Sequence, residues 1–277
     1  MVLVQLTNGF GNNLFQYNAA RLLAEYHNQD VYAIPPSQDY YAVPCLKKLG
    51  IKFFDGQDKV SSLIGVNDAN YNYFFDKQFL SYNFMLNGYF EDYTYYKEHI
   101  QDIKKWYPKV NKRGNNDLVI HFRAGDRLFY KNEFDSKPSV KSYLKAIEQF
   151  DFEDLHIVTD MPKWEEITEL DLAKMKFHKD VPKEQSVAPA DSVRYFNSFV
   201  EGLSKYNPTV KKRTVGEDFE FIRTFNNILF QHGTLGWWAA ALSEAQHVGV
   251  YGPWRPWKAQ SNKNLSEVGL EGWFKWK

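Results

Sequence analysis

The sequence predicts an α/β fold with mainly parallel sheets, organised as two Rossmann-like lobes. Apolar segments of strand length alternate with segments of helical spacing, the pattern of strand–helix–strand units. The first apolar segment runs directly into a glycine-bearing turn and a helix. The chain has 277 residues, enough for two domains of about 100–150 residues, each with its own core.

The elements follow from apolar spacing along the chain. Strands are expected over residues 2–6, 118–122, 155–159, 228–231 and 248–251. Helices are expected over residues 12–26, 140–150, 192–205 and 235–246. Because these two kinds of segment alternate, the sheets are expected to be mainly parallel.

Two further regions define the organisation. Residues 104–117 carry Pro108, Gly114 and several charges and form the candidate linker. The lobe boundary is therefore placed near residue 115, with lobes over residues 1–114 and 115–277. Residues 40–95 follow neither period and are crowded with Tyr, Phe and Asn. Since aromatic platforms and amides suit sugar recognition, an acceptor surface is expected there.

The turn after the first strand contains Gly9 and Gly11, followed by Asn12. Glycine permits a positive φ or close approach of a ligand, and N–H groups at a helix start suit a pyrophosphate. The third glycine of a dinucleotide fingerprint is missing, and the Lys-Ser/Thr pair of a Walker loop is absent from the sequence. The turn is therefore a candidate phosphate contact, with an ordinary βα turn as the alternative.

The segment after the apolar run 118–120 holds His121, Arg123 and Asp126. Open α/β sheets bind ligands beyond the carboxyl ends of their strands. A guanidinium there binds phosphate bidentately and stays charged at any working pH. Arg123 is thus a candidate for an anionic ligand, with a loop ion pair to Asp126 as the alternative. His121 is either a ligand-orienting side chain or a packed residue at the strand end.

Composition excludes several classes of function. Lys plus Arg and Asp plus Glu each number 34, so the net charge is zero and no nucleic-acid partner is expected. Cys45 is the only cysteine, so neither an intrachain disulfide nor a cysteine cluster is possible. No apolar run approaches the roughly 18 residues of a membrane span. The chain also has no Asp-x-Asp triplet to hold a divalent metal under a diphosphate, so no metal is expected.

Three segments resemble the α-1,2-fucosyltransferases of glycosyltransferase family 11 and the wider fucosyltransferase superfamily. Residues 9–17, Gly-Phe-Gly-Asn-Asn-Leu-Phe-Gln-Tyr, resemble the family opening Gly-Leu-Gly-Asn-Gln-Met-Phe-Gln-Tyr. Residues 121–126, His-Phe-Arg-Ala-Gly-Asp, are similar to the superfamily motif His-x-Arg-Arg-x-Asp. Residues 218–238 are similar to its acidic helix, apolar strand and Ser/Thr-Phe-Ser-Trp-Trp segment.

This resemblance implies a GT-B type glycosyltransferase, with two lobes facing a cleft. It implies an inverting, metal-independent enzyme that moves L-fucose from GDP-fucose to a glycan hydroxyl. Carried over, Asp218 receives the guanine edge, while Gly233 and Thr234 meet the phosphates. A carboxylate suits guanine because it accepts from the ring N–H and the exocyclic amine together. Arg123, the backbone at residues 9–12 and His121 complete the expected donor site.

The general base is left open between Asp126 and Glu133, the second of which lies near the position where α-1,6 relatives use a glutamate. Asp126 has the alternative role of anchoring Arg123 or Arg127. Asp160 is similar to the family's Ser/Thr-Asp-Asp turn and is expected to cap the next helix. The basic cluster at residues 211–213 is expected to be a solvated turn, with an approach to the donor phosphates as the alternative.

The chain departs from the family pattern at several positions. Ala124 stands where a second arginine is usual, Asn13 replaces a glutamine, and Gly233 and Gly236 replace serines. These departures leave open the same fold with another donor such as UDP-xylose, or a non-catalytic glycan-binding protein. A dinucleotide-using enzyme is a weaker alternative. A soluble cytoplasmic protein of bacterial or viral type is expected, because a eukaryotic Golgi enzyme of this kind would carry a membrane anchor.

Overall fold

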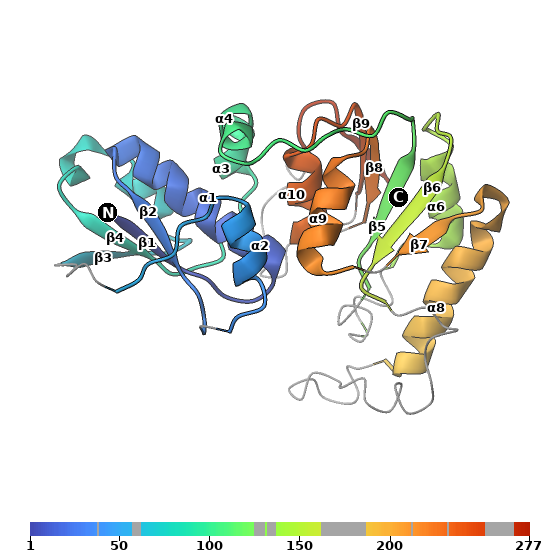
Figure 1. Cartoon of the computed structure of the whole chain (residues 1–277), viewed down its shortest axis with the longest axis horizontal. Coiled ribbons are helices and arrows are strands. Elements are labelled where there is room, and N and C mark those ends of the chain that lie inside the picture. The colour runs from blue at the N-terminus through green and yellow to red at the C-terminus, as the bar shows by residue number, and fades with distance from the viewer. Residues whose placement is uncertain are drawn as a thin grey trace. The chain divides into compact units, whose positions relative to one another are not determined.

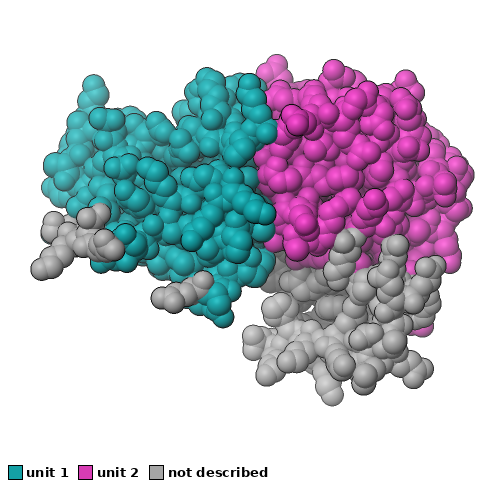
Figure 2. Space-filling view, viewed as in Figure 1, with its two compact units in different colours: residues 1–109, 237–242 teal, residues 110–236, 243–277 magenta. Residues whose placement is uncertain are grey.

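The computed structural model describes residues 1–37, 39–56, 62–124, 131, 137–161, 187–211, 213–231, 233–252 and 269–277. The chain forms two compact units, coloured separately in Figure 2. Unit 1 consists of Met1–Lys109 with Trp237–Leu242, and unit 2 of Val110–Gly236 with Ser243–Lys277. Each unit contains one parallel β-sheet, which confirms the predicted α/β class. No helix in these described ranges is long and apolar enough to cross a membrane.

Unit 1 is built on a four-stranded parallel sheet in the order β2-β1-β4-β3 (Figure 1). Its strands are β1 (Val2–Gln5), β2 (Val31–Ile34), β3 (Leu63–Val66) and β4 (Asn83–Leu86). Its helices are α1 (Phe10–His27), α2 (Val43–Lys48), α3 (Thr94–Lys97) and α4 (Ile100–Lys105), with 3₁₀ turns at Tyr71–Phe74 and Lys77–Phe79. Helix α1 packs against β1 and β2, and apolar side chains along it are buried.

Unit 2 is built on a six-stranded parallel sheet in the order β10-β9-β8-β5-β6-β7. Its strands are β5 (Leu118–Phe122), β6 (Leu155–Thr159), β7 (Thr209–Lys211), β8 (Asn227–Phe230), β9 (His247–Tyr251) and β10 (Phe274–Trp276). Its helices are α6 (Val140–Ile147), α8 (Pro189–Gly202) and α9 (Val215–Arg223), with a 3₁₀ turn at Ser204–Tyr206. Helix α10 (Thr234–Ala241) begins in unit 2, and its residues from Trp237 on belong to unit 1. Counted within the unit, this is the 3-2-1-4-5-6 strand order of the doubly wound fold.

Helices cover both faces of the second sheet, with α6 and α8 on one side and α9 and α10 on the other (Figure 1). Strand β5 is buried along its whole length. Its side chains alternate between the faces: Phe122 stacks on Phe199 of α8 at 4.4 Å between ring centroids, while His121 lies against α10. The chain beyond Phe122 therefore leaves the core at the carboxyl edge of the sheet.

The strands expected over residues 118–122 and 155–159 are found at these residues, and the other predicted strands and helices differ only at their ends. Residues 40–95 show no clear hydrophobic periodicity, yet they contain β3 and β4, which complete the first sheet. Each has only four residues, and β3 is an edge strand with exposed side chains, so neither shows a clear alternation.

A single lobe boundary near residue 115 does not describe the two units, because residues 237–242 belong to unit 1. Trp237 and Trp238 are fully buried. Their ring centroids lie 5.3 and 5.0 Å from that of Phe15 on α1. Trp237 and Trp238 thus join unit 1 by packing on Phe15, more than two hundred positions earlier in the sequence. No local sequence pattern indicates this contact.

Candidate functional site

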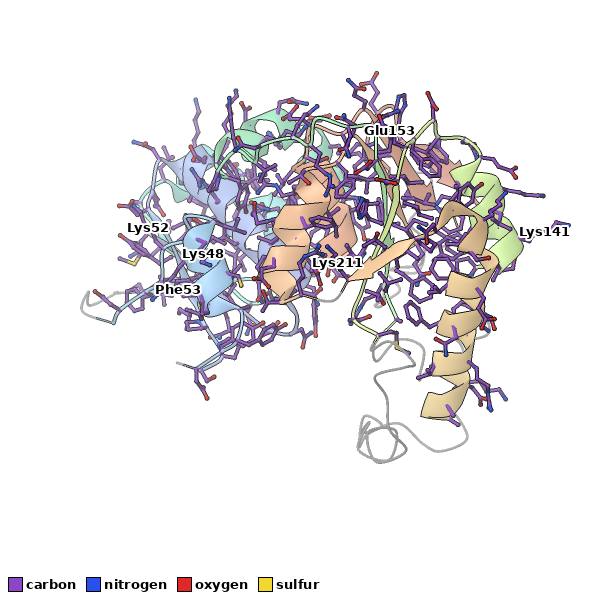
Figure 3. The ribbon with its side chains drawn as sticks, turned by 45° about the vertical axis from the view of Figure 1, so that its right-hand side comes forward. Lys48, Lys52, Phe53, Lys141, Glu153 and Lys211 are labelled. Carbon is purple, nitrogen blue, oxygen red and sulfur yellow. The ribbon has the colours of Figure 1, made fainter. Side chains whose placement is uncertain are left out.

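The candidate site lies at the carboxyl edge of the unit 2 sheet, where the strand order reverses between β5 and β8. The chain leaving β5 leads to β6 on one side, and the chain leaving β8 leads to β9 on the other. The two connections therefore lead away from each other, and doubly wound sheets bind ligands in the crevice between such connections. Figure 3 labels Glu153, which lies before the amino end of β6, and Lys211, which lies at the carboxyl end of the neighbouring β7. Because the sheet is parallel, the candidate residues that follow its strands lie at the end marked by Lys211.

Arg123, directly after β5, is held by side chains from two neighbouring strands. Its guanidinium forms an ion pair with the carboxylate of Asp160, which follows β6. The other oxygen of Asp160 accepts the backbone N–H of Ala124 at 2.9 Å. From the end of β8, Gln231 donates its side-chain N–H to the Arg123 carbonyl, and the Tyr143 hydroxyl donates to the Gln231 amide oxygen. The loop is thus fixed while 31% of the Arg123 side chain stays exposed.

Asp160 has a role that the sequence did not predict, because it binds the loop after β5. The N–H of Met161 donates to the Thr159 hydroxyl at 3.1 Å, and the helix that Asp160 was expected to cap lies outside the described residues. Asp126 and Glu133, the two candidate bases, lie outside the described residues. The carboxylate that pairs with Arg123 in the described structure is therefore that of Asp160.

Gly233 and Thr234 form the turn that leads from β8 into α10. Gly233 has φ +111°, which side-chain-bearing residues rarely adopt. A Cβ at Gly233 would lie 3.4 Å from Cγ of Arg123, so the turn passes close to the arginine stem. Helix α10 begins at Thr234. The structure therefore places Gly233, with Thr234 after it, beside Arg123, and their role in donor binding stays a prediction.

His121 lies under the first turn of α10 and is almost completely buried. A Cβ at Gly236 would be 2.5 Å from its Nδ1, so this contact requires glycine. Nδ1 is buried, and no hydrogen-bond partner for it lies among the residues that the structure describes. Burial, with a smaller effect from the Arg123 charge, lowers the pKa of His121 to about 3. The ring is therefore neutral at physiological pH and fixed in place, which agrees with the packing alternative for this residue.

Asp218 is the fourth residue of α9, whose N-terminus is capped by Thr214 and Glu217. The carboxyl group is mostly buried, and its Oδ1 lies 3.6 Å from Nη1 of Arg213, an ion pair too long for a hydrogen bond. Burial raises the pKa of Asp218 to about 6, although the Arg213 charge opposes this shift. The guanidinium of Arg213 stacks on Phe221 at 3.7 Å. The expectation of a solvated turn is thus wrong for Arg213.

The predicted residues of the first turn belong to unit 1. Gly9 is the N-cap of α1 with φ −83°, so it does not need a glycine conformation. The positive φ, 60°, is at the preceding Asn8. Gly11 is buried in the first turn of α1 and Asn12 is partly exposed. Of the two alternatives expected for these glycines, a positive φ is therefore not found, and close approach of a ligand stays a prediction.

Sequence reasoning missed Gln231, Tyr143 and the pairing of Arg213. A polar amide directly after an apolar strand was a usable signal for Gln231, because buried amides need partners. Tyr143 carried no signal, since it occupies an apolar position in a helix. The described parts of the chain contain no group of three or more His, Cys, Asp or Glu placed to hold a metal ion. No protein-family model matches this chain, and no curated protein matches it.

Replacing Gly236 by Ala tests the contact with His121. The new Cβ forces His121 or α10 to move, so Gly236→Ala is expected to lower the free energy of unfolding by about 1–3 kcal/mol. Urea denaturation measures this, with Gly114→Ala as the matched control, since a Cβ there meets no atom within 4 Å. Equal stability of the two variants would contradict the close contact.

Two substitutions separate the roles of Asp160. Asp160→Asn removes the ion pair but keeps an acceptor for the Ala124 N–H, and a partly exposed pair is worth about 0–1 kcal/mol. Asp160→Ala also leaves that buried N–H without its acceptor, which adds about 1–2 kcal/mol. Chemical denaturation is expected to rank the stabilities as wild type, then Asn, then Ala. An Ala variant as stable as the Asn variant would show that the backbone bond is unimportant.

Proposed function

We propose that this chain is a metal-independent, inverting glycosyltransferase of GT-B type that transfers L-fucose from GDP-fucose to a glycan hydroxyl. The observation that supports it most directly is Arg123, held at the strand-order reversal of unit 2 beside Gly233 and the start of α10. A guanidinium, a glycine turn and a helix start are together suited to a diphosphate. The three segments that resemble fucosyltransferases add the donor class.

In this proposal the acceptor hydroxyl attacks C1 of the sugar while the bond from C1 to the diphosphate oxygen breaks. The electron pair leaves with GDP, and Arg123 stabilises the charge that develops on the β-phosphate. The hydroxyl proton passes to Asp126 or Glu133, which remain the candidate bases. Asp160 orients the guanidinium through their ion pair. Gly233 and Thr234 supply backbone contacts to the donor. The turn with Gly9, Gly11 and Asn12 belongs to unit 1 and is not assigned to the diphosphate.

Recognition of the guanine of GDP is assigned to Asp218. An ionised carboxylate accepts the guanine ring N–H and the amine together, whereas uracil offers only one such donor. The pKa of about 6 leaves Asp218 ionised at neutral pH but not in mild acid. A buried carboxylate with a raised pKa beside Arg213 is typical of a functional site. His121, neutral and packed under α10, supports the loop that carries Arg123.

Thermal unfolding with GDP, UDP or NAD, each with and without EDTA, tests the donor class. A ligand that binds only the native state raises its stability by mass action, so GDP is expected to raise Tm and EDTA to leave that rise unchanged. Arg123→Met is expected to abolish the rise, while Arg194→Met, which removes an equal charge from exposed α8, leaves it intact. Selective stabilisation by UDP, or none by any nucleotide, would contradict the proposal.

The Asp218→Asn variant has a predicted pH signature. A folded-state pKa above the unfolded value means that ionised Asp218 destabilises the fold, fully above pH 6 and not at all below about pH 4. The variant is therefore expected to be more stable than wild type at pH 7.5, by on the order of 1–2 kcal/mol after allowance for solvent screening. This advantage disappears by pH 4.

Urea titrations at both pH values measure this difference, and GDP binding is followed in parallel. The variant is expected to lose its preference for GDP while gaining stability. A less stable variant at pH 7.5 would show that Asp218 serves the fold rather than a ligand.

A further inference from the structure

The sheet of unit 1 has a strand-order reversal of its own, between β1 and β4. The chain leaves β1 for β2 on one side, whereas β4 is paired with β3 on the other. The residues that follow the two strands, Thr7 and Asn8 after β1 and Gly88 and Tyr89 after β4, therefore lie where a parallel sheet is open to a ligand.

The backbone at this reversal is locked by buried amides. Gln16, which is fully buried, donates to the Thr7 hydroxyl at 2.7 Å and to the Gly88 carbonyl at 2.8 Å. Its amide oxygen accepts the Thr7 N–H at 3.0 Å, and Asn13 donates to the Thr7 carbonyl at 2.9 Å. The Gln16 side chain thus joins the ends of β1 and β4. A ligand that binds here therefore loses little affinity to the ordering of these loops.

Asp68 locks the second loop in the same way. Its two carboxylate oxygens accept the N–H groups of Tyr89 and Phe90 at 3.0 and 2.6 Å. A Cβ at Gly88 would lie 2.3 Å from the carboxylate, so only glycine fits beside it. The Tyr89 hydroxyl in turn accepts the side-chain N–H of the exposed Asn8 at 2.6 Å. Both loops are therefore held in one conformation.

Two adjacent tyrosines project from this locked backbone. The Tyr40 hydroxyl bonds to the Asn8 carbonyl and to the Asn13 side-chain oxygen, the latter at 2.8 Å. The Tyr41 hydroxyl accepts the N–H of Phe10 at 3.3 Å, yet Tyr41 is 57% exposed. The two ring centroids are 4.9 Å apart with an interplanar angle of 67°. Exposed aromatic surface is thus held in place by hydroxyl groups.

We propose that this tyrosine edge, formed by Asn8, Tyr40, Tyr41, Asp68 and Tyr89, binds an uncharged sugar residue. Aromatic faces pack on the C–H surface of a sugar, and amide and carboxylate groups bind its hydroxyls. None of the five side chains is cationic, and Asp68 repels an anion. Under the proposed function, on which this role rests, the sugar belongs to the acceptor. The edge therefore selects neutral glycans over sialylated, sulfated or phosphorylated ones.

Binding of the full-length protein to an array of neutral and anionic oligosaccharides, followed by saturation-transfer NMR of the bound glycans, tests this edge. Wild type is expected to bind neutral glycans in preference to their anionic counterparts. Tyr41→Ala is expected to weaken that binding by about tenfold. Tyr73→Ala is the matched control and should bind as wild type, since Tyr73 is also in unit 1 and is 64% exposed.

Thermal unfolding with and without GDP, run on the same variants, verifies folding and separates this inference from the proposed function. An unchanged response to GDP together with lost glycan binding in Tyr41→Ala supports both. Glycan binding that depends on Tyr41 without any GDP response supports the tyrosine edge and refutes the donor assignment. The inference is overturned if Tyr41→Ala binds as wild type, if anionic glycans bind better, or if wild type binds no neutral glycan.

Discussion

Pairing of β5 with β6 and β8 is the constraint on which the candidate site depends. Phe122 lies opposite Thr159 of β6, and His121 lies opposite Phe230 of β8. Continuing these registers by one residue aligns Arg123 with Asp160 and brings Gln231 beside Phe122. The side chains of Asp160 and Gln231, which follow the two flanking strands, therefore reach the same loop. A slip of one residue would turn His121 and Phe122 to the wrong faces and separate these partners.

Burial determines the charge state of the groups around this loop. His121 is neutral because the packing of α10 through Gly236 excludes water from its ring. Asp218 keeps a raised pKa even with Arg213 beside it, since the ion pair does not fully compensate desolvation. The net charge of the chain is zero, so any positive potential must be local. The phosphate site proposed for unit 2 depends on such a local charge, that of Arg123.

The two strand-order reversals use the same topology with different side chains. In unit 2 the loops are fixed by an arginine–aspartate pair and a buried glutamine. In unit 1 they are fixed by Gln16 and Asp68, and tyrosine rings cover the edge. A guanidinium favours a charged leaving group, whereas rings and amides favour a neutral sugar. The two proposals follow from this difference in side-chain chemistry rather than from the shared topology.

The sequence by itself determined the parallel α/β class, the buried strands at residues 118–122 and 155–159, and the arginine at a strand end. These features are local, because an apolar run and the residue that follows it lie within a few positions of each other. Only the tertiary structure decided that Asp160 binds the loop after β5, 36 positions away, and that Gln231 reaches Arg123 across 108 positions. It also decided that Trp237 and Trp238 pack in unit 1. Such contacts depend on strand register and on which helix faces which side of a sheet, and no local pattern encodes either.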